Sequence, residues 1–268
     1  MVQEYLILLN ERDFVVGTNL YLALKRMRKA ECARTLWIDA ICINAICINQ
    51  EDDLEKGIQV QIMDKVYSKA RLVVVWLGEE EPADKLAFNL LHQWHERITS
   101  QEGAVYWLGE VWKNNYAELK SPGWAALAKL LKRRWFRRVW VIQEAVMASK
   151  AVILCGTLQI SWDILEHVLC AFVDGPIIGL LQSNNAFFDT GLHGIEMSVK
   201  VKRIRGFLAS GGEFMLLDLL SVTRMLEATD QRDRVFALIS LIRPVEANRK
   251  LTTRCPSRSS SRKWIFLS

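Results

Sequence analysis

The feature that most constrains the fold is an unbroken apolar run from Leu72 to Leu77, which ends at Gly78. The preceding segment, residues 54–70, repeats apolar residues at four-residue spacing from Ile58 to Ala70, which predicts a helix with one apolar face. An apolar run without alternation is typical of a strand covered on both faces. Because a helix followed by such a strand is the unit of a parallel sheet, we predict an α/β fold.

Shorter patterns predict the remaining elements. We expect strands at residues 5–9, 36–38 and 151–154, and helices at residues 19–29, 84–98, 124–134, 136–148, 162–172, 218–224 and 233–242. Thr18 and Ser161 are expected to cap the helices that follow them. Residues 99–120 have the character of an insertion or lid, and residues 175–194 that of a loop.

The net charge of +5 comes from the last twenty residues, which hold six Lys or Arg and no acidic residue. The rest of the chain has 29 basic and 30 acidic residues, so whole-chain charge gives no case for nucleic-acid binding. A basic run with aromatic residues lies between Lys129 and Arg138. Binding of nucleic acid or acidic lipid is one interpretation of this run, and a solvated helix face plus partners for Glu144 is the favoured one.

The six cysteines form no Cys-x-x-Cys pair and several lie in apolar runs, which favours reduced, buried thiols in a cytoplasmic protein. We expect no signal peptide, and no membrane span in the apolar stretch Val168 to Leu181, which Asp174 and Pro176 interrupt. The four histidines do not predict a metal site, because no third ligand lies near His92 and His95.

Four segments, in this order, resemble the fungal heterokaryon-incompatibility (HET) family. They are Leu36 to Asn44, the helix and strand ending in Trp76-Leu77-Gly78, Arg134 to Glu144, and Asp230 to Leu238. The chain departs from the family pattern in two ways. It shows no Ser-Tyr-x-Trp-Gly type segment, so we expect the family's first strand to be missing. A five-residue repeat, residues 40–44 and 45–49, also splits the first segment.

HET domains resemble TIR domains, so the resemblance implies a flavodoxin-like parallel sheet flanked by helices. Many TIR domains cleave NAD with a glutamate four residues after a tryptophan, and Trp140 and Glu144 have this spacing. On a helix these two side chains share a face, and a carboxylate can stabilise the positive charge of glycosidic cleavage. Glu144 is therefore the candidate catalytic residue, with Trp140 beside it. The alternative is that Glu144 pairs with a surface base: Arg137, Arg138 or Lys150.

Three further residues join Arg137 and Trp140 as ligand-binding candidates. Asp39 follows a predicted strand and would face the ligand crevice of a parallel sheet. The alternative for Asp39 is a cap or a salt bridge with Arg137. Asn49 and Gln50 have the donors to bind a ligand, although such residues in tight loops more often bond to the backbone.

The organisation predicted is a HET domain at residues 1–165, a mainly helical extension at 166–247 and a disordered basic tail at 248–268. The resemblance implies a cell-death effector of fungal self/non-self recognition that is switched on by an activating partner in trans. If the domain is catalytic, the resemblance implies that NAD is its substrate. It implies no cofactor with certainty. The alternatives are a non-catalytic signalling module that acts as a homo-oligomer, or an inactive copy.

Overall fold

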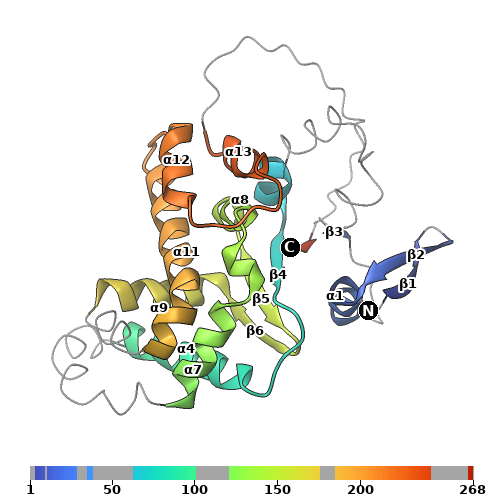
Figure 1. Cartoon of the computed structure of the whole chain (residues 1–268), viewed down its shortest axis with the longest axis horizontal. Helices are drawn as coiled ribbons and strands as arrows, with labels where there is room; N and C mark the ends of the chain where they lie inside the picture. The colour runs from blue at the N-terminus through green and yellow to red at the C-terminus, as the bar shows by residue number, and fades with distance from the viewer. Residues whose placement is uncertain are drawn as a thin grey trace, which may run out of the picture.

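The computed structural model describes residues 4–9, 11–28, 35–38, 63–100, 121–175, 185–242 and 265–267, with only the backbone described for residues 9, 185–191 and 265–267. A five-stranded sheet lies at its centre, in the order β3 (Leu36–Ile38), β7 (Ile265–Leu267), β4 (Leu72–Trp76), β5 (Ala151–Cys155) and β6 (Leu158–Ser161). The first four strands are parallel, and β6 pairs antiparallel with β5. The mixed α/β class is therefore confirmed, while the TIR-like arrangement stays a prediction (Figure 1).

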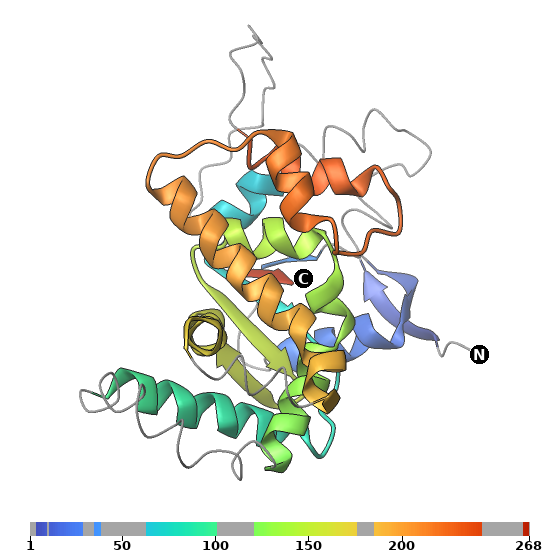
Figure 2. The same ribbon diagram turned by 60° about the vertical axis from the view of Figure 1, so that its left-hand side comes forward.

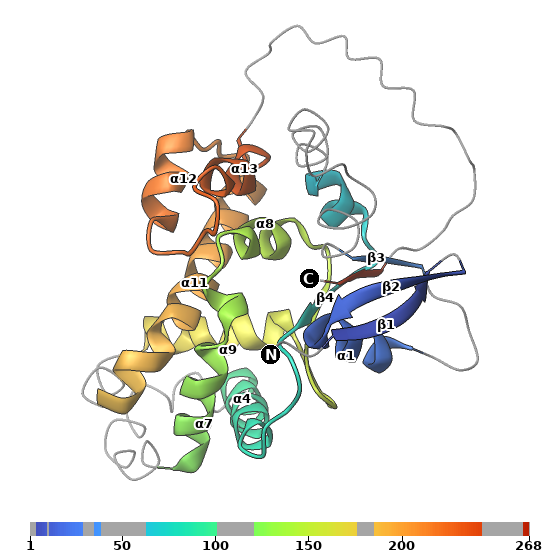
Figure 3. The same ribbon diagram turned by 45° about the vertical axis from the view of Figure 1, so that its right-hand side comes forward.

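Strand β4 is covered on both faces, as its unbroken apolar run predicts. On one face Val74 and Trp76 pack with Ala23 and Met27 of helix α1 (Thr18–Met27). The Trp76 indole donates a hydrogen bond to Asn19 of α1, with 3.0 Å between Nε1 and Oδ1. On the other face the main helical layer covers the sheet, so α1 and these helices lie on opposite sides in Figures 1 and 3.

Seven helices build the main layer in the described part of the chain. They are α4 (Asp84–Thr99), α7 (Pro122–Leu131), α8 (Trp140–Met147), α9 (Trp162–Asp174), α11 (Asn185–Ala209), α12 (Leu216–Thr223) and α13 (Asp233–Ile239). Figure 2 shows α11 running across the other helices. One apolar core extends from Val75 of β4 to Leu241 after α13, and Trp94, Trp124 and Phe172 meet inside it. Among the described helices, none has both the length and the apolar character to cross a membrane.

A two-stranded hairpin stands apart from the central sheet. Strands β1 (Glu4–Leu9) and β2 (Arg12–Gly17) pair antiparallel, and Tyr5 stacks on Tyr21 of α1 at 4.2 Å between ring centroids. The sequence patterns indicated β1 but not β2. Val16 is buried, whereas its neighbour Val15 is 52% exposed. Because apolar residues lie on both faces of this short strand, its sequence shows no clear alternation of apolar and polar residues.

The helix predicted at residues 136–148 is wrong in its first part. Residues Arg134–Arg137 form a 3₁₀ turn, and α8 begins only at Trp140. The chain leaves the helical path here because it pairs with a distant segment. The Glu227 N–H donates to the carbonyl of Arg137, and the Val139 N–H donates to the carbonyl of Glu227. A local pattern carries no information about this pairing.

Other differences concern caps, the loop and the tail. The N-cap of α1 is Gly17 and not Thr18, because Thr18 is already part of the helix. The predicted Ser161 cap of α9 is confirmed, because the Ser161 hydroxyl accepts a hydrogen bond from the Ile164 N–H. The loop predicted at 175–194 is wrong from residue 185, where α11 begins. Three residues of the predicted tail, 265–267, form β7 between β3 and β4. The predicted domain boundary at residue 165 falls inside α9, and helices on both sides of it share the core. The predicted lid lies almost wholly outside the described residues.

Candidate functional site

Glu144 lies on α8, one turn after Trp140, as the sequence predicts. Glu144 is only 1% exposed, and its carboxylate accepts a hydrogen bond from the Trp135 indole at 2.9 Å. Trp135 in turn meets Phe136 and Trp162 edge to face. Trp140 is half-buried and packs against the same core. Glu144 is therefore built into an aromatic core and does not lie at an exposed helix surface. Whether it also pairs with a base stays a prediction.

Arg137 points to a different carboxylate. Its guanidinium forms an ion pair with Glu227, at the place where the two backbone segments pair. Gln143, the neighbour of Glu144, donates from Nε2 to the Ser240 hydroxyl at 2.7 Å. These contacts join the third HET-like segment to the region of the fourth. The structure thus places Trp140 and Glu144 together on α8, and Arg137 at a partly exposed contact with the segment between α12 and α13.

Asp39, Asn49 and Gln50 lie outside the described residues. Strand β3 ends at Ile38, and its parallel partners place its carboxyl end at the same edge of the sheet as the carboxyl ends of β4 and β5. In open α/β sheets this edge is the usual place for a ligand. The role of these three residues stays a prediction.

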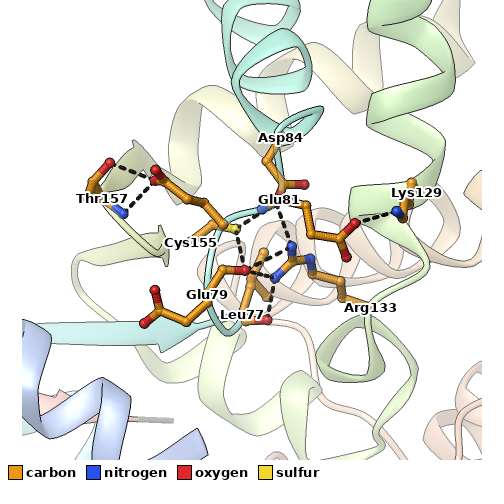
Figure 4. Close-up of polar contacts among 9 residues, drawn as sticks. Leu77, Glu79, Glu81, Asp84, Lys129, Arg133, Cys155 and Thr157 are labelled. Carbon is orange, nitrogen blue, oxygen red and sulfur yellow. Dashed lines mark hydrogen bonds and ion pairs between the residues drawn. The ribbon is translucent and has the colours of Figure 1, made fainter.

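At this edge the described residues form a polar network that the sequence analysis did not anticipate (Figure 4). The Arg133 guanidinium donates to the carbonyls of Leu77 and Glu79, and forms an ion pair with Asp84 at 2.6 Å. The side chains of Arg133 and Asp84 are only 16% and 3% exposed. The Cys155 thiol, at the end of β5, lies 3.3 Å from the same Asp84 oxygen. Arg133 therefore fastens the loop after β4 to α4 and α7.

The outer part of this loop is held by two exposed carboxylates. Glu80 accepts from the Thr157 amide at 2.8 Å and from its hydroxyl at 2.6 Å, which lowers the pKa of Glu80. Glu81 forms an ion pair with Lys129, and that hydrogen bond lowers the pKa of Glu81. The turn that follows β5 comes close to the same loop, since the Gly156 N–H donates to the Gly78 carbonyl at 2.9 Å.

Two signals in the sequence could have found this network. Three consecutive glutamates, residues 79–81, follow a strand that ends in glycine, and three bases, Lys129, Lys132 and Arg133, stand in the next basic segment. The basic run was predicted to supply partners for Glu144, whereas Lys129 and Arg133 pair with Glu81 and Asp84. Spacing along one helix cannot show that these two residues face the loop after β4.

Cys155 and Cys170 are expected to resist thiol reagents in the folded protein. Burial raises the pKa of the Cys155 thiol to about 12 and that of Cys170 to about 11, so almost no thiolate forms near pH 8. Alkylation at pH 8 followed by peptide mass spectrometry should find both unmodified, and both modified after unfolding in guanidinium. Rapid labelling of either in the folded chain would contradict their buried position.

The Glu80 contact predicts a specific pH response. The folded pKa of Glu80 lies below 4.5, so its contribution to stability is present above that pH and is lost as the pH falls through the folded pKa. Thr157→Ala should return the pKa of Glu80 toward 4.5, as followed by the carboxyl carbon signal in an NMR titration. The pKa of Glu81 should not change in that variant. It should rise in Lys129→Ala instead, because Lys129 is its partner.

These features define a mixed α/β domain whose conspicuous carboxylates, Glu144 and Asp84, are both bound inside the fold. Among the described residues, no group of three or more His, Cys, Asp or Glu is arranged to hold a metal ion.

The profile of the heterokaryon incompatibility protein (HET) family matches residues 2–144, more than half of the chain, so the chain belongs to this family. It is similar to heterokaryon incompatibility protein 6, OR allele, of Neurospora crassa, with 27% identity over 252 residues. The match covers 81% of this chain and 36% of that protein, so the chain spans about a third of the length of its curated relative. No solved structure matches.

Proposed function

We propose that this chain acts as a cell-death effector in fungal heterokaryon incompatibility, and that it does so by protein association rather than by catalysis. Its membership of the HET family, together with the name of its Neurospora relative, supports the role in incompatibility. The burial of Glu144 supports the non-catalytic mode. A glutamate that acts on a ligand must reach it, whereas Glu144 is 1% exposed as a residue and its carboxylate accepts a hydrogen bond from Trp135.

A second candidate is cleavage of NAD at the nicotinamide glycosidic bond. The observation in its favour is that Trp140 and Glu144 lie one turn apart on a single helix, α8. This chemistry requires the segment around α8 to open, because a carboxylate must approach the ribose as positive charge develops there. An activating partner in trans, or assembly of several copies, would have to supply the free energy for that opening.

The test uses induced expression of the whole chain in a fungal host, with growth and cellular NAD measured together. The proposal expects wild type and Glu144→Gln to arrest growth equally, with no early fall in NAD. Purified, concentrated protein should likewise leave NAD intact. A fall in NAD that Glu144→Gln abolishes would contradict the non-catalytic mode, and normal growth with folded chain present would contradict the effector role.

Trp135→Phe separates a structural from a catalytic role for Glu144. Trp135→Phe removes the indole donor but leaves the Glu144 carboxylate in place. If Glu144 has a structural role, the free energy of unfolding should fall by about 1–3 kcal/mol. Glu144→Gln retains an acceptor for the indole and should cost less. Thermal unfolding of the two variants gives this comparison, and it shows whether a loss of activity reflects a loss of folding.

A further inference from the structure

Two histidines that are far apart in the sequence meet on the surface of the helical layer. His95 lies on α4 and His167 on α9, and their Nδ1 atoms are 3.3 Å apart. The rings are nearly perpendicular, at 82°, with their centroids 5.3 Å apart. Both side chains are half-buried, so one side of the pair remains open to solvent.

The separation of the two nitrogens permits a long hydrogen bond and also fits a metal ion that bridges them. N–H donors in proteins mostly lie about 2.9–3.0 Å from their acceptors. With Zn–N bonds of about 2.0–2.1 Å and tetrahedral angles, two ligand nitrogens lie about 3.3–3.4 Å apart. The Nδ1 atoms therefore already stand at the distance that two ligands of tetrahedral zinc require.

The two helices hold this distance without help from an ion. Trp94, next to His95, packs edge to face on Phe172 of α9, with 5.5 Å between the ring centroids. Leu91 of α4 and Val168 of α9, which flank the pair, are buried in the same core. A ligand pair carried by two packed helices is preorganised, so little conformational entropy is lost on binding.

We propose that His95 and His167 form a two-histidine site for a divalent transition-metal ion, Zn²⁺, whose remaining positions are taken by solvent. Imidazole nitrogens suit zinc, nickel and copper among the divalent ions. Two features limit the affinity. Within the described residues, the structure shows no carboxylate or carbonyl that accepts from the outer nitrogen of either ring, and Lys202 is close enough to His167 to interact with it electrostatically. Such a site would tie α4 to α9 reversibly.

The test is Zn²⁺ binding to the whole chain by isothermal titration calorimetry. His95→Asn and His167→Asn should each weaken the zinc affinity by at least about tenfold. His92→Asn is the matched control, because His92 lies exposed on the same helix one turn earlier, and it should bind like wild type. Binding that survives in both ligand variants, or no binding by wild type at submillimolar zinc, would overturn the proposal.

Copper provides a measurement that does not depend on a substitution. Electron paramagnetic resonance of the wild-type chain with one equivalent of Cu²⁺ should show coupling to two imidazole nitrogens. A spectrum with no nitrogen coupling would count against the pair as the site. Neither zinc binding nor the copper spectrum depends on growth arrest or on NAD. The metal-site proposal can therefore be wrong while the effector proposal holds, and the reverse is also true.

Discussion

Arg133→Met is expected to lower the free energy of unfolding by about 3–5 kcal/mol, because it leaves the Asp84 carboxylate buried without its charged partner. The loss includes the bonds from the guanidinium to the carbonyls of Leu77 and Glu79, which hold the loop after β4. Urea unfolding followed by circular dichroism measures the change. This is the largest effect that the polar network predicts for one substitution.

The matched control for this prediction is Lys129→Met. Lys129 also bonds an acidic residue of the same loop, but its side chain is 60% exposed and that of its partner Glu81 is 50% exposed. Because water screens an exposed pair, the midpoint of unfolding should move little. Equal losses in the two variants would show that Arg133 is not an anchor. The double variant Asp84→Asn with Arg133→Met should lose less than the sum of the two single changes.

Gly156→Ala is expected to cost roughly 2–5 kcal/mol, since left-handed strain of about 1–2 kcal/mol adds to overpacking of about 1–3 kcal/mol. Gly156 has φ of +52°, and a Cβ placed there would lie 2.7 Å from the backbone nitrogen of Glu80. The neighbour is main chain, so it cannot turn aside as the end of a side chain would. Thermal unfolding of the purified variant gives the value.

Gly211→Ala supplies the comparison that isolates the steric part of this cost. Gly211 also has a positive φ, +81°, but no atom lies within 4 Å of its added Cβ. Only the backbone strain should therefore remain, at about 1–2 kcal/mol. If both alanine variants lost the same stability, the close approach between the β5–β6 turn and the loop after β4 would be refuted.

The sequence predicted best where a local pattern was sufficient. The apolar run of β4 implied cover on both faces, and the structure has α1 on one face and the main helical layer on the other. The Ser161 cap was likewise visible, because its partner, Ile164, is only three residues away. In each case the interactions that fix the element lie within a few residues or follow from hydrophobicity alone.

Two of the larger errors share one physical source, which is pairing between segments distant in the sequence. The break before α8 depends on Glu227, and the strand character of residues 265–267 depends on β3 and β4. The candidate site shows the same limit. The spacing of Trp140 and Glu144 placed both on one helix face, but the burial of Glu144 depends on Trp135 in a 3₁₀ turn that the helical pattern concealed.

The shared core has a consequence for how this family is dissected by truncation. The stretch that matches the HET profile ends at residue 144, inside α8, while α9, α11 and α13 complete the core that α8 enters. A fragment cut at that point would expose Leu127, Phe136 and Ile142 to water, and we expect it to aggregate or to remain a molten globule. Loss of the proposed effector activity in such a fragment would report the absence of a folded domain, so it could not map the surface responsible. The smallest fragment suited to mapping includes the core as far as Leu241 and also strand β7, which lies between β3 and β4.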